Sequence, residues 1–197
     1  MQPQKFRSHA KLVLASTSPR RKEILARLGL PFEIIAPDFE EVSNDALSAK
    51  EEALQFARGK ARSVATKFQN AVVIGSDTLI ACEGEKIGKP KDACDAEGIL
   101  QKLQGRAHLI WTAVVIVETP DQMTHEFVEK VEVRLNPMTE VEIDDYIQTG
   151  EPLDKAGCYA VQGIGARFIQ SLEGDRLAAI GLPLAPISAF LKSRRML

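Results

Sequence analysis

Hydrophobic residues in the first half of the chain fall into two alternating kinds of segment. Short apolar runs rich in β-branched residues predict buried strands over residues 11–15, 32–36 and 71–75. Stretches in which apolar residues recur every three or four positions predict helices over 20–28 and from 49 to about 68. Strands that alternate with helices are typical of an α/β protein.

The second half of the chain places strands next to one another. Two long strand patterns are joined by a short Thr-Pro-Asp turn, which predicts a hairpin of neighbouring strands. Together with the first half, this predicts an α/β fold with a mixed, twisted sheet, and neither a repeat nor a linker divides it. The expected elements are the strands 78–82, 85–88, 109–118, 124–135, 168–172 and 177–180, and the helices 93–104, 140–149 and 186–192.

Composition and charge exclude several classes of protein. Hydrophobic residues make up 45% of the 197 positions and charged residues 26%, which excludes disorder as the main state. The net charge is -2, whereas a dedicated nucleic-acid binder carries a strongly basic domain, so we expect no stable nucleic-acid partner. Any anion site must therefore come from a local cluster of cations.

Cysteine usage and apolar segments indicate a reducing, cytoplasmic setting. Three cysteines at wide spacings, without a CxxC pair, argue against a disulfide framework or a zinc site. The first eleven residues are polar and hold no apolar core of a signal peptide. The longest apolar run, 109–117, is interrupted by Thr112 and is far shorter than the ~20 residues of a membrane span. We therefore expect no membrane partner.

A cluster of cations stands at the start of the first predicted helix. Ser18 and Pro19 suit the N-cap and first helical positions, and Arg20, Arg21 and Lys22 follow. Three cations at a helix N-terminus oppose the helix dipole. They are explained if an external anion binds there, held by backbone N–H groups, the Ser16 and Ser18 hydroxyls and the guanidinium groups. The alternative is that Arg21 and Lys22 are solvated surface charges and that Ser18 only caps the helix.

Carboxylates follow two of the predicted strands. Asp77 comes directly after the strand 71–75 and is expected at the carboxyl edge of the sheet, where ligands of α/β proteins bind. It is a candidate metal ligand or general base, or else the start of a turn. Glu40 and Glu41 lie in the loop after the strand 32–36. Two carboxylates beside an anion cluster suit a Mg²⁺–phosphate site.

Two further segments carry candidate ligands. The motif Gly-Lys-Pro-Lys at 88–91 contains Lys89, and the predicted long helix contains Lys60. Lysine side chains bind phosphate as point charges. The alternative for either lysine taken alone is an exposed surface residue. The stretch 149–163 is polar and glycine-rich without helical or strand periodicity. It is interpreted as a binding loop rather than core.

Taken together, these motifs resemble the Maf (septum formation protein) family in order and spacing over residues 11–192. The motifs are STSPRR (16–21), EE (40–41), ARGKA (57–61), IGSDT (74–78), GKP (88–90), GEPLDKAG (150–157), VQG (161–163) and GLP (181–183). The resemblance implies an α/β sheet in two lobes around a cleft, similar to the inosine triphosphate pyrophosphatases. It also implies a homodimer, a single domain over 11–197 and an N-terminal extension over 1–10.

The resemblance also implies roles for individual residues. Asp77 matches the proton acceptor of the family, and Glu41 matches a carboxylate near the metal ion. The triad Arg20, Thr78 and Gln162 resembles the subgroup that acts on dTTP and UTP, whereas the 7-methyl-GTP subgroup has Trp, Gln and Glu. The segment 173–180 departs from the family pattern. The residues that match substrate-binding positions are Ser16, Arg20, Arg21, Lys60, Thr78, Lys89 and Gln162.

The sequence therefore predicts a cytoplasmic nucleoside triphosphate pyrophosphatase that hydrolyses dTTP and UTP to the monophosphate and pyrophosphate with Mg²⁺ or Mn²⁺. Modified pyrimidine nucleotides are further possible substrates. Two alternatives are a Maf-type enzyme with another base preference and a non-catalytic nucleotide or nucleic-acid binding regulator of cell division.

Overall fold

The computed structural model describes residues 10–197, so the predicted extension over residues 1–10 lies, except for Ala10, outside the described residues. Seven strands form one mixed sheet in the order β2-β1-β3-β5-β6-β7, with β4 paired to β3. β1 is parallel to β2 and β3, and the other pairs are antiparallel. The strands are β1 (Lys11–Ala15), β2 (Glu33–Ile35), β3 (Ala71–Cys82), β4 (Glu85–Ile87), β5 (Ala107–Glu118), β6 (Met123–Leu135) and β7 (Ile169–Glu173).

Six α-helices and three short 3₁₀ segments surround the sheet in the described chain. The helices are α1 (Pro19–Ala26), α2 (Ala49–Ala65), α3 (Ala93–Leu103), α4 (Glu140–Gln148), α5 (Arg176–Ile180) and α6 (Leu184–Ser193). The 3₁₀ segments are η1 (Glu151–Asp154), η2 (Ala156–Cys158) and η3 (Ile164–Phe168). No helix within residues 10–197 is long and apolar enough to cross a membrane.

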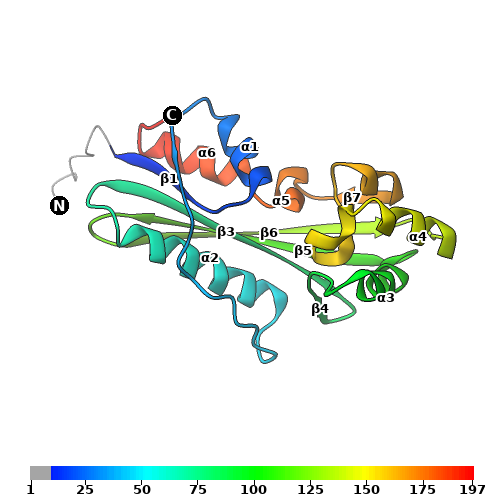
Figure 1. Cartoon of the computed structure of the whole chain (residues 1–197). Coiled ribbons are helices and arrows are strands. Elements are labelled where there is room, and N and C mark those ends of the chain that lie inside the picture. The colour runs from blue at the N-terminus through cyan, green and yellow to red at the C-terminus, as the bar shows by residue number, and fades with distance from the viewer. Residues whose placement is uncertain (1–9) are drawn as a thin grey trace.

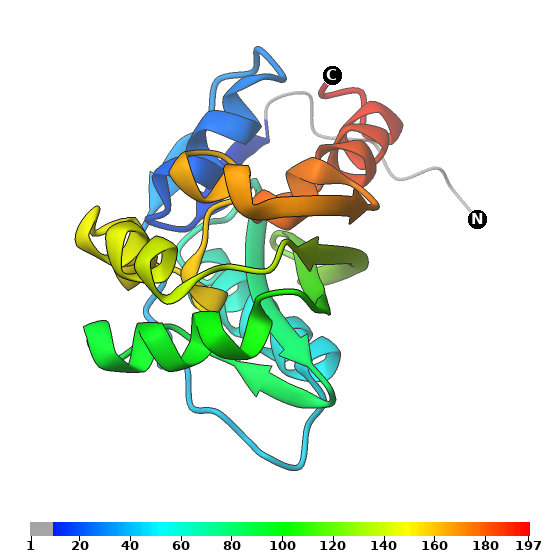
Figure 2. The same cartoon turned by 90° about the vertical axis from the view of Figure 1, so that its right-hand side faces the viewer.

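The long strands β3, β5 and β6 are shared by two lobes (Figure 1). In one lobe α2 covers one sheet face, while α1 and α6 cover the other, on alternating strand residues such as Val73 and Ile74. In the other lobe α3, α4 and the 3₁₀ segments pack on the far halves of the same strands around Leu100 and Tyr146. Figure 2 looks along the strands from this second lobe. The mixed α/β sheet predicted from sequence is confirmed.

Local capping signals correctly placed three of the six helix starts within residues 10–197. Ser18 caps α1, and capping boxes open α2 at Ser48 and α4 at Thr139. The hairpins β3–β4 and β5–β6 form as predicted.

Two predictions of strands were wrong. Residues 177–180 form part of helix α5, because the Asp175 carboxylate accepts from the Leu177 N–H at 2.8 Å and starts a helical turn. The predicted break after residue 75 is absent: β3 runs on through residues 76–79. Polar side chains there are satisfied within the sheet, since the Ser76 hydroxyl donates to the Ala113 carbonyl oxygen at 2.9 Å.

A buried histidine in β5 makes stability depend on pH. His108 is 2% exposed, its Nε2 lies 2.7 Å from Tyr159 Oη, and burial lowers its pKa to about 4. The His108 imidazole binds a proton more tightly in the unfolded chain than in the folded one. The contribution of neutral His108 to the unfolding free energy is therefore complete above the ordinary pKa of 6.5 and is lost as the pH falls toward 4. We expect His108 to account for a loss of about 2 kcal/mol in unfolding free energy between pH 7 and pH 5.

Urea unfolding at both pH values measures this loss, with His108→Gln as the control variant. The variant lacks the titrating group and should lose correspondingly less stability between the two pH values. An equal loss in both proteins would assign the acid sensitivity to other groups.

Candidate active site

A cavity of about 740 Å³ opens between the lobes at a gap in the strand pairing. β1 pairs with β3 up to Gly75, and β4 pairs with β3 from Ile80 onward, so in the described chain residues 76–79 have a strand partner only in β5. Successive side chains along this open edge point to opposite sheet faces. All nine residues predicted for the site line this cavity: Ser16, Arg20, Arg21, Glu41, Lys60, Asp77, Thr78, Lys89 and Gln162.

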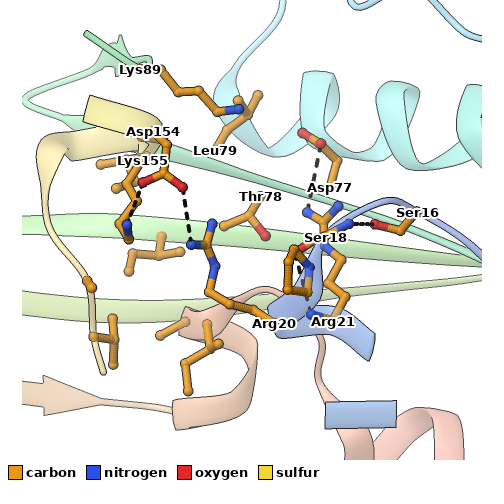
Figure 3. A pocket seen from close by; sticks show the side chains of 18 of the residues that line it. Ser16, Ser18, Arg20, Arg21, Asp77, Thr78, Leu79, Lys89, Asp154 and Lys155 are labelled. Atoms are coloured by element: carbon orange, nitrogen blue, oxygen red, sulfur yellow. Dashed lines mark hydrogen bonds and ion pairs between the residues drawn. The ribbon is translucent and has the colours of Figure 1, made fainter. Parts of the chain in front are cut away.

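The turn from β1 into α1 forms one wall of the cavity. Ser16 Oγ accepts from the Ser18 N–H at 3.1 Å, and Ser18 Oγ accepts from the Arg21 N–H at 3.4 Å (Figure 3). Ser18 therefore acts as a helix cap, in agreement with the simpler interpretation of that residue, and the buried Ser16 stiffens the turn. Hydrogen bonds within the turn therefore fix this wall without a ligand.

The three cations of α1 have different surroundings. The Arg21 side chain is 13% exposed, its Nε donates to the Gly181 carbonyl oxygen at 3.0 Å, and its Nη2 lies 4.0 Å from Asp77 Oδ1. Burial lowers the pKa of Arg21, although the nearby carboxylates raise it. Arg20 is half-exposed and lies 3.7 Å from Asp154 across the cavity (Figure 3). Lys22 is exposed and lies outside the cavity lining, so the surface interpretation holds for it.

Asp77 lies inside β3 rather than at its end, which corrects the sequence prediction. It is two residues beyond Gly75, the last partner of β1, so it still lies past the carboxyl end of that strand. Burial raises the pKa of Asp77, while Lys60 and Arg21 act to lower it, and the net direction is upward. The site thus contains a buried carboxyl group held between two cations.

Lys60 joins two carboxylates. Its Nζ lies 2.5 Å from Asp77 Oδ1 and 2.6 Å from Glu41 Oε1. Lys60 reaches Asp77 because α2 packs very closely on β3: a Cβ on Gly75 would lie 2.5 Å from the Ala57 carbonyl oxygen and 2.7 Å from the Ala61 nitrogen. The small residues of the ARGKA and IGSDT motifs therefore bring the helix cation to the strand acid.

The loop that carries Glu41 is fixed to α2 at two places. The Phe39 ring packs edge-on against Phe56, at 6.1 Å between ring centroids, and occupies the space where a side chain on Gly59 would lie. Further along the loop, the buried Glu52 carboxylate accepts from the Asn44 N–H at 2.6 Å. These two contacts hold Glu41 next to Lys60.

Sequence reasoning missed Glu52, although a signal existed. It stands on the buried face of α2, next to Ala49, Ala53 and Phe56. A carboxylate on such a face needs a partner, and Lys86 of β4 supplies it at 2.9 Å.

Removing the Glu52 carboxylate is expected to destabilise the protein strongly. Glu52→Ala leaves the partly buried Lys86 without its counter-ion and frees the loop, so we expect a loss of about 3 kcal/mol in unfolding free energy. Chemical denaturation measures it, and Glu126→Ala is the control, because it breaks the more exposed ion pair with Arg58 and should cost at most about 1 kcal/mol. Equal losses in both variants would mean that the ion pair of Glu52 with Lys86 contributes no more to the unfolding free energy than the exposed pair does.

Uncharged side chains also line the cavity. The Thr112 hydroxyl donates to the Ala178 carbonyl oxygen at 2.8 Å, so Thr78 is the donor in the 3.0 Å contact between the two threonine hydroxyls. Gln162 also lines the cavity, next to Val161, and the lining includes the apolar residues Leu79, Ile80, Ile110, Ala179 and Ile180.

The segment 149–163 was predicted as a polar loop outside the core, and this is wrong for part of it. Residues 157–161 are buried, and Cys158 and Tyr159 belong to the core of the second lobe. The short segments η1 and η2 allow this, because they provide the backbone with partners of its own. Lys155, which donates to the Glu151 carbonyl oxygen at 2.8 Å, adds a further cation to the cavity lining.

The carboxylate pair suits a divalent cation that is shared with a ligand. Across residues 10–197, no three His, Cys, Asp or Glu side chains gather closely enough to hold a metal ion by themselves. Asp77 and Glu41 supply two oxygens that converge on one cation, the Lys60 ammonium. Mg²⁺ is often held by one or two carboxylates together with phosphate oxygens and water, so these residues fit it when a phosphate ligand is present.

Known proteins resemble nearly the whole chain. A family model described as "Maf-like protein" matches residues 11–194. A protein named "dTTP/UTP pyrophosphatase" from Vibrio vulnificus (strain YJ016) is 43% identical over 88% of this chain and 93% of its own length. Relatives with the same name from Dictyoglomus thermophilum (40% identical, 91% and 94% covered) and Thermoanaerobacter sp. strain X514 (42%, 92% and 95%) are similar to a comparable degree.

Proposed function

The chain belongs to the Maf family, and we propose that it hydrolyses dTTP and UTP to the nucleoside monophosphate and pyrophosphate. The observation that carries this proposal is the placement of a buried acid, Asp77, among cations in a cavity whose lining also includes apolar side chains that suit an uncharged ring. A nucleoside triphosphate has this same division between a charged and an uncharged part.

The cations are proposed to hold the triphosphate. Arg21 and Lys60 lie beside Asp77, whereas Arg20 and Lys89 approach from the rim (Figure 3). Ammonium and guanidinium groups fixed in a partly buried site stabilise phosphate charge more strongly than they would in water. Ser16, at the end of β1, is proposed to contact the same phosphates.

Asp77 is proposed as the proton acceptor. A water molecule attacks the α-phosphorus and its oxygen forms a new P–O bond, while Asp77 accepts a proton from it. The bond between the α-phosphorus and the bridging oxygen breaks, and pyrophosphate leaves with the electron pair. An acid with a raised pKa is a stronger base for this step than an exposed aspartate.

Glu41 and Asp77 are proposed to hold Mg²⁺ or Mn²⁺ together with the phosphates. When bound, the cation neutralises phosphate charge and polarises the reacting phosphoryl group. Lys60, which contacts both carboxylates, would hold them in position beside the metal ion and the phosphates.

The cellular setting and the assembly are part of the proposal. All three cysteines are free thiols, which agrees with a cytoplasmic protein. We propose a single domain over 11–197 that forms a homodimer. Light scattering during size-exclusion chromatography, which should give twice the mass of the chain, tests the dimer.

A nucleotide panel tests the activity. The protein is incubated with each nucleoside triphosphate and Mg²⁺ or Mn²⁺, and pyrophosphate and monophosphate are measured. We expect release from dTTP and UTP above that from the other nucleotides. Release from another base alone would reassign the specificity, and nucleic-acid binding with a steep salt dependence and no turnover would support the regulatory alternative.

A further inference from the structure

Two side chains behind the cavity hold the segment that carries Gln162. Residues 159–163 form neither helix nor strand, yet their backbone is fixed from outside. Tyr146 on α4 accepts from the Ala160 N–H at 3.3 Å and donates to Glu151 Oε2 at 2.7 Å. Glu151 in turn accepts from the Ile164 N–H at 3.0 Å and the Gly165 N–H at 2.7 Å.

These contacts bracket Gln162 symmetrically. Ala160 lies two residues before it, and Ile164 lies two residues after it. One phenol–carboxylate pair therefore holds the backbone on both sides of the side chain that lines the cavity. Arg176 adds a contact between them, because its Nη2 donates to the Val161 carbonyl oxygen at 3.0 Å.

The fit between the pair and the segment is close. A Cβ on Gly163 would lie 2.3 Å from Glu151 Oε1, and one on Gly165 would lie 2.3 Å from Tyr146 Oη. Gly163 also has φ +119, in a region that favours glycine. The backbone thus reaches the pair only because both positions lack a side chain.

The protonation of the pair suits this arrangement. Burial and the neighbouring Glu151 raise the pKa of Tyr146, so the phenol stays a donor. Burial acts to raise the pKa of Glu151, but hydrogen bonds from Tyr146, Gly165 and Ile164 outweigh it and lower that pKa. Glu151 is therefore an ionised acceptor for all three donors.

We propose that Tyr146 and Glu151 are positioning residues for base recognition, which fix the Gln162 carboxamide in the cavity from behind. This rests on the proposed function, in which Gln162 faces the base. A recognition group must be held to within a few tenths of an ångström to discriminate between bases, and a segment without helix or strand needs such external support. The bracketing contacts, rather than the loop itself, then determine how sharply the enzyme distinguishes bases.

A double-mutant cycle between Tyr146 and Gln162 tests this role. Tyr146→Phe removes the hydroxyl and keeps the ring, and it should reduce the ratio of kcat/KM for UTP over GTP by about 10-fold. Gln162→Ala should reduce the same ratio at least as much. In the Gln162→Ala background, Tyr146→Phe should cause no further reduction, because the group that it positions is gone.

Controls separate positioning from stability. Glu142→Gln lies on the same helix as Tyr146 and weakens the exposed capping box at Thr139, so it should leave the UTP-to-GTP ratio unchanged. Glu151→Gln gives the same cycle at a second position if Tyr146→Phe fails to fold. Thermal unfolding of each variant confirms that the ratios belong to folded protein.

The outcomes distinguish this inference from the function on which it rests. If Gln162→Ala changes the ratio while Tyr146→Phe and Glu151→Gln do not, the positioning role is overturned and the proposed function stands. If Tyr146→Phe reduces the ratio equally with and without Gln162, the pair acts elsewhere and the inference is again overturned. If Gln162→Ala itself leaves the ratio unchanged, base reading by Gln162 fails, and the inference fails with it.

Discussion

Asp77→Asn is expected to lower kcat for UTP hydrolysis by at least about 10²-fold, the lower end of what a positioned general base contributes. The asparagine side chain has nearly the same shape and keeps an oxygen that can accept from Lys60. It cannot accept a proton from water at neutral pH. The effect should therefore appear in kcat at saturating nucleotide, measured as pyrophosphate release.

Two conditions make this test decisive. Asp144→Asn makes the same chemical change on the exposed face of α4 and should leave kcat unchanged. Because Asp77→Asn leaves Lys60 and Arg21 buried with less compensating charge, a lower melting temperature is also expected, so rates are compared well below it. A near-wild-type kcat in folded Asp77→Asn would remove Asp77 from the chemical step.

Short-range signals explain why much of the fold could be predicted from sequence. The capping boxes at Ser48 and Thr139 and the Ser18 cap involve residues three apart, so they are visible along the chain. The four-residue apolar run 177–180 fits a strand and a helix equally well, and only the Asp175 cap decides between them. The continuity of β3 past Gly75 depends on β5, which lies more than thirty residues away in sequence.

In the candidate site, too, some features could be predicted from the sequence and others depend on contacts between distant parts of the chain. Its nine residues were predicted because they fall within motifs of a known family, and all of them reach one cavity. The side chains that place them were not predicted. Glu52 acts on the Glu41 loop, and Tyr146 and Glu151 act on the Gln162 segment, through contacts that only the folded chain creates.

These supporting contacts also explain how a site can be assembled from segments spread over most of the chain. Arg21 Nε donates to the Gly181 carbonyl oxygen at 3.0 Å, and the Ser76 hydroxyl, shared between this oxygen and that of Ala113, lies 2.9 Å from each, so β3, α1 and the segment after α5 are tied together. Glu52 ties the acidic loop to α2 and β4 in the same way. Several of the predicted site residues, among them Arg21, Glu41 and Lys60, therefore depend on partners from other parts of the sequence.

Gln162→Glu is expected to shift the substrate preference from uracil and thymine toward guanine. A carboxamide offers a donor and an acceptor side by side, which match a carbonyl and the N3–H of uracil or thymine. A carboxylate offers only acceptors, which suit the N1–H and 2-amino edge of guanine. When the carboxylate faces a pyrimidine carbonyl, two buried acceptor oxygens oppose each other with no hydrogen between them. The ratio of kcat/KM for UTP over GTP should therefore fall by at least about 10-fold.

The measurement is pyrophosphate release from UTP, dTTP, CTP and GTP by the wild-type protein and the Gln162→Glu variant. CTP is informative because an amide can also pair with cytosine after rotation by 180°, so rejection of CTP by the wild type must come from other residues. Thr78, which donates its hydroxyl hydrogen to Thr112, offers only acceptor lone pairs to a ligand in the cavity. An unchanged UTP-to-GTP ratio in the folded variant would show that Gln162 does not read the base.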